Sequence, residues 1–383
     1  MFSRIYIHTP YCRQKCPYCA FYSIPSAGTD EIAAYTELLH GELELAAAQS
    51  TGSGRIDSVY FGGGTPSLLE SAQIERLLRH IDRVFNLDSS AEITLETNPG
   101  TVDSGKLAAF RAAGINRLSI GVQSFDDRLL AALGRIHSAH ESRNTIAAAH
   151  AAGFAAIGID LICALPGQNL AQWSQELHTA ASLAPQHISV YGLTIEENTP
   201  FAQQFPEESP LLPDDELAAA MLEQAHAQLG NQGYEHYEIA NYARPGYRSR
   251  HNSGYWRRDG YLGLGAGAHS FFRTGSTGKR FSNHADITRY RSDILAGTLP
   301  TSESTQLSRE DAMAEAMYLG LRLKDGIDFE TFRLEYGVSP AARYQTAIDE
   351  LLKHGLLEPT AGGVRLTLRG MLLSNQVFQR FLS

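Results

Sequence analysis

Six short apolar runs alternate with helical patterns as far as Leu193, and this alternation restricts the folds open to the chain. The runs occupy residues 4–8, 58–62, 92–96, 117–122, 155–162 and 187–193. Between the second and third runs, apolar residues recur at the i, i+3, i+4, i+7 spacing of one helix face, at Ile74, Leu77, Leu78, Ile81 and Phe85. Another helix is predicted over residues 30–48, with Asp30 as its N-cap. This pattern predicts an α/β fold with a parallel sheet, either doubly wound or an incomplete barrel.

The strand-helix rhythm breaks after Leu193, where a proline-rich stretch contains Pro200, Pro206, Pro210 and Pro213. Such a stretch marks a boundary, and a helix is predicted to begin near Asp214. Further helical patterns occupy residues 309–323 and 340–354, and residues 362–368 predict a short hairpin or wing before a last helix. We therefore expect a core at 1–205, a barrel extension at 206–307 and a small winged-helix-like α+β module at 308–383.

The composition narrows the class of protein. The chain has 383 residues, 43% of them hydrophobic and 19% charged, so a folded protein with a substantial core is expected. This length suggests two domains, or one large barrel with an appendage. Basic residues number 32 against 42 acidic ones, giving a net charge of -10, and no segment is dense in Lys and Arg. We therefore expect no nucleic-acid partner.

Cysteine usage and hydropathy predict the cellular compartment. The four cysteines are too few for a disulfide scaffold, which favours a reducing environment. No apolar stretch near the amino terminus is long enough for a signal peptide, and no run of about 20 apolar residues follows. We expect a soluble cytoplasmic protein with no transmembrane segment.

Three of the four cysteines, Cys12, Cys16 and Cys19, lie within eight residues directly after the first apolar run. Three thiolates on one loop bind three irons of a four-iron four-sulfur (4Fe-4S) cluster and leave the fourth iron open to a small molecule. A zinc knuckle or a chance group of core cysteines is the alternative, but zinc loops usually repeat a two-residue spacing and have a second ligand pair further on. Cys163 stands alone in an apolar run, and we expect it to take no part.

A glycine-rich segment, Gly62-Gly63-Gly64-Thr65-Pro66, follows the second apolar run. Adjacent glycines let the backbone approach a ligand closely and offer amide donors, but by themselves they equally fit a strand-to-helix turn.

Three polar residues occupy strand positions further on. Glu96 and Gln123 end the third and fourth predicted strands, and Asp160 lies in the fifth. Because a buried carboxylate without a partner is costly, each is either paired structurally or bound to a polar ligand. The residues alone leave both readings open.

A second group of ligand-binding residue types is His251-Asn252-Ser253-Gly254-Tyr255-Trp256. These residues suit a large flat ligand, because histidine is a common axial ligand of haem iron and aromatic rings pack on a porphyrin face. By itself the segment is more often a polar turn beside an aromatic anchor. The glycine-rich stretch 263–269 lacks the strand context of a dinucleotide loop, so we predict a close-packed turn there.

The stretch from Tyr6 to Cys19, Tyr-Ile-His-Thr-Pro-Tyr-Cys-Arg-Gln-Lys-Cys-Pro-Tyr-Cys, resembles the cluster loop of radical S-adenosylmethionine (SAM) proteins. The branch in question contains oxygen-independent coproporphyrinogen III oxidase and the HemW haem chaperones. The resemblance spans most of residues 1–300 and, less specifically, the C-terminal module. It implies a partial (βα)6 barrel in which SAM binds the open iron and one electron releases methionine and a 5'-deoxyadenosyl radical.

The resemblance also implies roles for individual residues. The expected SAM contacts are Tyr6, Tyr18, Gly63, Gly64, Thr65, Glu96, Gln123, Arg135 and Asp160. Among them, Arg135 matches a carboxylate-binding arginine, Tyr18 is expected to offer its ring or backbone to adenine, and Tyr6 equally suits core packing. The segment also resembles the His-Asn-x-x-Tyr-Trp segment of HemW-type chaperones, which implies haem contacts at His251, Asn252, Tyr255 and Trp256.

Two departures favour the HemW branch. The oxidases have an extra cysteine where this chain has Phe21, and they have a longer segment before the first strand, whereas three residues precede Arg4 here. We predict a protein that binds a 4Fe-4S cluster and SAM, holds haem as cargo and transfers it to acceptor proteins. Its other expected partner is a low-potential electron donor, and a homodimer stays open. SAM cleavage fits this prediction. The alternative is a coproporphyrinogen III oxidase that uses the radical to convert propionate side chains to vinyl groups.

Overall fold

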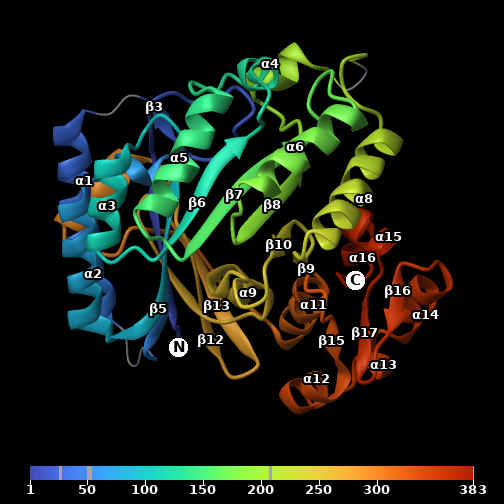
Figure 1. Cartoon of the computed structure of the whole chain (residues 1–383). Helices are drawn as coiled ribbons and strands as arrows, with labels where there is room; N and C mark the ends of the chain where they lie inside the picture. Colours follow the sequence, from blue (N-terminus) through green and yellow to red (C-terminus); the bar gives the residue numbers. More distant parts are fainter. Residues whose placement is uncertain (26–27, 50–53, 207–208, 383) are drawn as a thin grey trace.

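A twelve-stranded sheet forms the centre of the protein, seen in the computed structural model of residues 1–25, 28–49, 54–206 and 209–382 (Figure 1). Its strand order is β14-β13-β12-β11-β1-β4-β5-β6-β7-β8-β10-β9. The six predicted strands are β1 (Arg4–Thr9), β4 (Ile56–Gly63), β5 (Leu87–Thr97), β6 (Arg117–Gln123), β7 (Ala156–Cys163) and β8 (His187–Gly192). Each pairs in parallel with the next. The predicted partial barrel is thereby confirmed.

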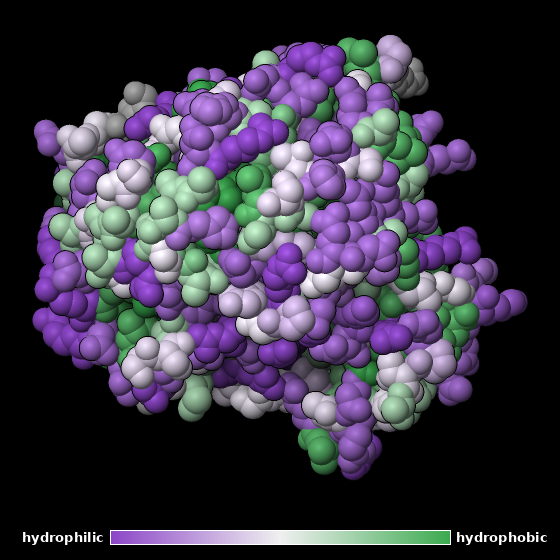
Figure 2. Space-filling view, viewed as in Figure 1, coloured by the Kyte–Doolittle hydropathy of each residue, from purple (hydrophilic) through white to green (hydrophobic). Residues whose placement is uncertain are grey.

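Helices cover the outer face of the parallel strands. They are α1 (Thr29–Gln49), α2 (Ser71–Phe85), α3 (Ser104–Ala112), α5 (Ala139–Ala151), α6 (Leu170–Ser182) and α8 (Asp215–Asn231). Two short helices, α4 (Asp127–Ala132) and α7 (Pro200–Gln204), instead contribute to a separate apolar cluster that contains Leu129 and Phe201. The predicted stripe of α2 is buried along its length, as amphipathic spacing requires. Asp30 lies in the first turn of α1 rather than before it. Hydrophilic residues cover much of the face in Figure 2, because the apolar helix faces point inward.

The inner face of the sheet is polar. Along β4, Val59 and Phe61 are fully buried toward the helices, so the alternate residues Ser58 and Tyr60 face the barrel interior. The parallel register places Ser58 beside Glu92, and further along the sheet it pairs Glu96 with Ser119 and Gly121 with Asp160. Carboxylates from neighbouring strands therefore gather on one inner surface, where a polar ligand can bind.

Residues after α8 extend the sheet at both edges. They form β9 (Glu235–Glu238), β10 (Asn241–Ala243), α9 (Arg250–Trp256), β11 (Tyr261–Leu264), β12 (His269–Thr274), β13 (Thr277–Asn283), α10 (Ile287–Leu295) and β14 (Thr301–Gln306). The 263–269 stretch is the predicted close-packed turn, since Gly265 has φ +100° and the buried Glu42 accepts from its backbone N at 2.7 Å. Glu42 also accepts from the Tyr290 hydroxyl at 2.7 Å. Its carboxylate joins α1 to the end of β11.

The C-terminal module has its own core. It comprises α11 (Arg309–Gly320), β15 (Ile327–Asp328), α12 (Phe329–Tyr336), α13 (Pro340–Arg343), α14 (Gln345–Lys353), β16 (Leu357–Pro359), β17 (Gly363–Leu366), α15 (Leu368–Leu372) and α16 (Ser374–Gln379). A three-stranded sheet, β15-β17-β16, packs on helices through Met317, Phe332 and Phe381. The helix predicted over 340–354 is divided at Tyr344, where ψ is 21°. Ser383, the end of the predicted module, lies outside the described residues. Among the described helices, none is long and apolar enough to cross a membrane.

Candidate functional site

The three cysteines of the amino-terminal loop line one cavity of about 480 Å³ at the carboxyl ends of the parallel strands. A short parallel pair, β2 (Tyr11–Cys12) and β3 (Ile24–Pro25), closes the base of this loop. Within the loop, the Cys19 backbone N donates to the Cys16 carbonyl at 3.1 Å. Cys163 is fully buried at the end of β7 and is not among the residues that line the cavity.

The glycines after β4 bring the strand end against the cysteine loop. At Gly64, an added Cβ would lie 2.6 Å from the Tyr11 carbonyl oxygen and 3.0 Å from Cys12 Sγ. At Gly63, φ is +111° and an added Cβ would lie 2.6 Å from the His8 ring. Neither position can hold a side chain, because other atoms already fill the space where its Cβ would lie. At Gly63 the positive φ would also strain any residue other than glycine. The glycine-rich segment therefore lets the backbone reach the loop and the cavity.

Most of the predicted SAM-binding residues line this same cavity. They are Tyr18, Gly63, Gly64, Thr65, Glu96, Gln123, Arg135 and Asp160. Tyr6 is the exception: its hydroxyl is 3.1 Å from His8 Nδ1 and its ring stacks on that of Tyr60, with the centroids 6.1 Å apart. Tyr6 is not among the residues that line the cavity, and its contact with SAM stays a prediction.

The carboxylates of Glu96 and Asp160 line the cavity and accept hydrogen bonds from neighbouring protein groups. The Tyr60 hydroxyl donates to Glu96 Oε1 at 2.8 Å, and the Gly63 backbone N donates to Glu96 Oε2 at 3.1 Å. The Ser119 hydroxyl donates to Asp160 at 3.1 Å. Burial raises the pKa of Glu96 to about 7, with the nearby Asp160 adding to the rise, and burial also raises the pKa of Asp160. These carboxylates can accept hydrogen bonds from hydroxyl groups of a ligand.

Arg135 connects the cavity to the cysteine loop. Its Nη1 lies 3.4 Å from Cys16 Sγ, and its Nη2 donates to the Asn98 side chain at 2.5 Å and to the Gly121 carbonyl at 2.9 Å. Asn98 in turn donates to Thr65 Oγ1 at 3.2 Å. Sequence reasoning missed Asn98, which lies two positions after Glu96 and directly follows the end of β5.

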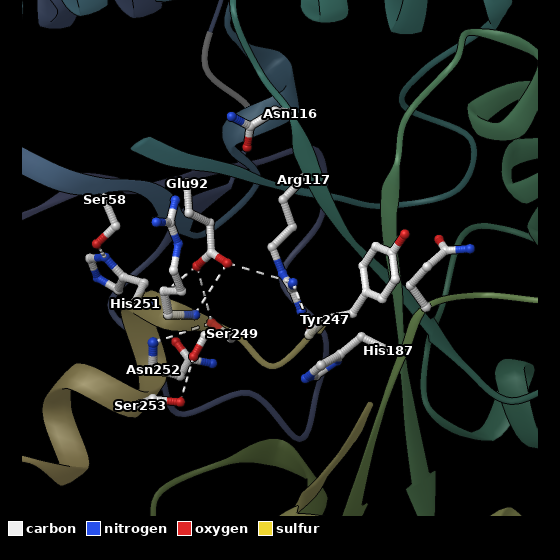
Figure 3. Close-up of polar contacts among 12 residues, drawn as sticks. Ser58, Glu92, Asn116, Arg117, His187, Tyr247, Ser249, His251, Asn252 and Ser253 are labelled. Atoms are coloured by element: carbon white, nitrogen blue, oxygen red, sulfur yellow. Dashed lines mark hydrogen bonds and ion pairs between the residues drawn. The ribbon is translucent and has the colours of Figure 1, made fainter. Parts of the chain in front are cut away.

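The His251–Trp256 segment forms most of α9, near the amino-terminal ends of the parallel strands (Figure 3). Glu92 of β5 accepts from the backbone N of Arg250 at 3.1 Å and of His251 at 3.0 Å. The same carboxylate lies 3.6 Å from Arg117 Nη1. Because the first N–H groups of a helix have no partner within it, Glu92 stabilises the start of α9.

The His251 ring is enclosed and both its nitrogens are occupied. Nδ1 lies 2.9 Å from the Ser58 hydroxyl, and Nε2 lies 2.8 Å from the Tyr255 hydroxyl. The residue is fully buried, and this burial lowers the pKa of its imidazole to about 3. Both ring nitrogens already have partners inside the protein in this conformation, and the haem contact of His251 stays a prediction.

Tyr255 and Trp256 lie differently from His251. Both line a second cavity of about 230 Å³, together with residues of β11, β12, β13 and α11. The Arg322 guanidinium lies 4.2 Å from the Trp256 ring centroid, so a residue two positions after the end of α11 covers one side of the indole. Asn252 is half-buried, and its backbone N donates to the Ser249 hydroxyl at 3.2 Å. The structure therefore separates the six-residue motif into a buried histidine and an aromatic cavity wall.

Two family models match separate parts of the chain. The family model described as the radical SAM superfamily matches residues 6–180, and the HemN C-terminal domain model matches residues 307–373. The chain is 35% identical over 380 residues to the heme chaperone HemW of Bacillus subtilis (strain 168), covering 98% of each chain. It is 36% identical over 386 residues to that of Haemophilus influenzae, covering 99% of this chain and 97% of the relative.

One solved structure shares the fold over the whole chain. It is the coproporphyrinogen III oxidase HemN from Escherichia coli, described as a radical SAM enzyme, with a TM-score of 0.85. The two sequences are 24% identical, and the match covers 100% of this chain and 90% of that one. At this identity the likeness shows the fold alone.

Proposed function

This chain belongs to the HemW heme chaperone family of radical SAM proteins, and on that premise we propose that it binds a 4Fe-4S cluster and SAM and carries haem to acceptor proteins. The observation that carries the proposal is the cysteine loop: all three cysteines line a cavity to which five of the parallel strands, β4 to β8, also contribute residues. Two relatives that match over nearly the full length are named as heme chaperones. In this proposal the larger cavity binds the cluster and SAM, and the α9 segment binds haem.

The larger cavity suits the cluster and SAM. Cys12, Cys16 and Cys19 would hold three irons, and a bound cluster with SAM supplies one-electron cleavage of a carbon-sulfur bond. The protein's own groups would orient the cosubstrate, since Glu96 and Asp160 are acceptors suited to ribose hydroxyls. Arg135 is suited to a carboxylate, because its planar guanidinium donates two parallel hydrogen bonds.

The cargo site is proposed at α9, with different roles for its residues than the sequence suggested. Tyr255 and Trp256 would contact haem, whereas His251 would act as a positioning residue that holds the Tyr255 hydroxyl at 2.8 Å. The two roles predict different spectra. In His251→Ala, a positioning role weakens haem binding and leaves the Soret wavelength of the bound haem unchanged, whereas loss of an iron ligand would shift that wavelength.

The partners follow from the carrier role. We propose that the protein interacts with haem-accepting proteins and with a low-potential electron donor that reduces the cluster. We also propose a cytoplasmic location. Four unpaired cysteines and the absence of a membrane-spanning helix among the described residues support this location. We also propose a homodimer, and sedimentation of the cluster-loaded protein would test it by measuring the mass of the assembly. The sequence has no segment dense in Lys and Arg, so we propose no nucleic-acid partner.

Anaerobic reconstitution followed by three parallel assays tests the proposed function. Saturating SAM should change the electron paramagnetic resonance spectrum of the reduced cluster, and Glu96→Ala should weaken that change. Haem should give a saturable Soret shift. Coproporphyrinogen III should not be converted when cluster, SAM and reductant are all present, because Phe21 stands where the oxidases have a further cysteine. Conversion of coproporphyrinogen would instead support the oxidase.

A further inference from the structure

A small cavity beside α9 is lined by both aromatic rings and arginine side chains. Its walls are aromatic, from Tyr255, Trp256, Tyr261 and Phe271, and two arginines, Arg258 and Arg280, also line it. The remaining lining residues are Asp259 and Leu319. At about 230 Å³ the cavity is below the range of about 300–1,000 Å³ that holds a whole drug-sized ligand. It can take one arm of a ligand and the ring edge that bears the arm.

Both arginines pair with the Glu315 carboxylate, and Arg258 Nη1 also lies 3.9 Å from Glu335 Oε1. Arg258 Nε donates to Glu315 Oε2 at 3.1 Å, and Arg280 Nε donates to Glu315 Oε1 at 2.8 Å. Both guanidinium groups also flank the Phe271 ring, at 5.3 and 4.8 Å from its centroid. Asp259, the acid of the lining, pairs with Arg4 at 3.1 Å and is therefore already neutralised.

Two buried donors of the lining residues lack an acceptor within the part of the chain that the structure describes. They are the indole Nε1 of Trp256 and Nη2 of Arg258. Arg258 is only 3% exposed, so bulk water does not solvate its guanidinium. A buried donor without a partner destabilises a fold, and native proteins rarely retain one unless a ligand or an ordered water completes it.

We propose that this cavity receives a carboxylate-bearing edge of a planar ligand, with Trp256 Nε1 and Arg258 Nη2 as donors to the carboxylate. The proposal rests on the haem-carrying function and makes the ligand arm one propionate of haem with its pyrrole ring. A carboxylate has two oxygens and several lone pairs, so one group satisfies both donors. The aromatic walls pack on the ring edge.

The chemistry favours a carboxylate over a neutral arm. The free donors belong to an indole and a guanidinium, neither of which accepts a hydrogen bond, so the ligand must supply the acceptor. The guanidinium is charged, and a hydrogen bond between charged partners is about twice as strong as a neutral one. An esterified propionate keeps a carbonyl acceptor, loses the charge and gains a methyl group, so the preference of the wild type for the acid is compared with that of a variant that lacks a donor.

Titration of wild-type protein with haem and with haem dimethyl ester, followed by the Soret band, tests the proposal. The free acid should bind about tenfold more tightly than the ester, the effect of one charge-assisted hydrogen bond. In Trp256→Phe the preference for the acid should fall several-fold, because the ring stays and the N–H is lost. Trp173→Phe is the matched control: its indole donates to the Met221 carbonyl at 2.8 Å in the core, and the acid preference should stay unchanged.

The outcomes separate this inference from the proposed function. Equal binding of acid and ester to the wild type would overturn the inference, since the two donors would then serve water, while haem carriage would stand. An unchanged acid preference in a folded Trp256→Phe variant would also overturn it. If wild-type protein bound neither compound, the proposed function would fail and this inference with it.

Discussion

Replacing Glu92 with alanine should strongly destabilise the protein and loosen α9. The carboxylate accepts from two backbone N–H groups, at 3.1 and 3.0 Å, and lies 3.6 Å from Arg117. Both side chains of the ion pair are at most 8% exposed. Removing one member of a buried pair costs about 3–5 kcal/mol, because the other charge stays buried without its partner. Loss of a helix cap costs about 1 kcal/mol, which overlaps with that loss because the same carboxylate serves both.

Urea denaturation of the wild type and of Glu92→Ala measures the effect. We expect a loss of about 3–5 kcal/mol in the free energy of unfolding. The control is Glu330→Ala, which removes a carboxylate that is 62% exposed and pairs with the exposed Arg333. Exposed ion pairs contribute at most about 1 kcal/mol, so this control should lose little stability.

A double variant tests whether the loss of stability comes from the unpaired charge of Arg117 or from the change of shape at Glu92. Glu92→Gln with Arg117→Met leaves no buried charge unpaired, so it should regain most of the stability that Glu92→Ala loses. At temperatures where Glu92→Ala stays folded, haem affinity should fall while cluster absorbance persists, since the cysteine loop lies at the other end of the strands. A loss below about 1 kcal/mol in Glu92→Ala would refute the reasoning, because the carboxylate would then not be holding the helix.

Three further predictions address the cluster loop and the buried carboxylates. Cys12→Ala should abolish cluster absorbance after anaerobic reconstitution, and Cys163→Ser should retain it; equal losses would contradict a three-thiolate site. Gly64→Ala should reduce cluster loading several-fold, because the new Cβ would lie 2.6 Å from the Tyr11 carbonyl oxygen. Burial raises the pKa of Glu42 from 4.5 to about 7, so its contribution to stability falls as the pH rises between those values, by about 1.4 kcal/mol per pH unit. In Glu42→Gln, urea denaturation should show this part of the pH dependence removed; an identical slope would contradict it.

The positions of the strands and of the cofactor cavity were predictable because both depend on local patterns. Apolar runs and helical spacing placed all six parallel strands, and the carboxyl ends of parallel strands meet at one edge of a sheet. Glu96, Gln123 and Asp160 were therefore expected to lie together, and they line one cavity with the cysteine loop. Asn98 escaped prediction because its role depends on Arg135, which is distant in the sequence.

The α9 segment was only partly predictable from the sequence. Its residue types predicted a flat-ligand site, and two of them, Tyr255 and Trp256, do line a cavity. The enclosure of His251 was not predictable, because its partner Ser58 lies 193 positions away and only the tertiary fold joins them.

The sequence by itself determined the alternation of strands and helices, the cysteine spacing and the glycines that admit the loop, since each is a property of neighbouring residues. The tertiary structure alone decided which polar side chains face the cavity, which are paired inside the barrel and which buried donors lack an acceptor. The physical reason is that burial and hydrogen-bond partners are set by contacts between elements distant in the chain, and a linear pattern does not contain those contacts.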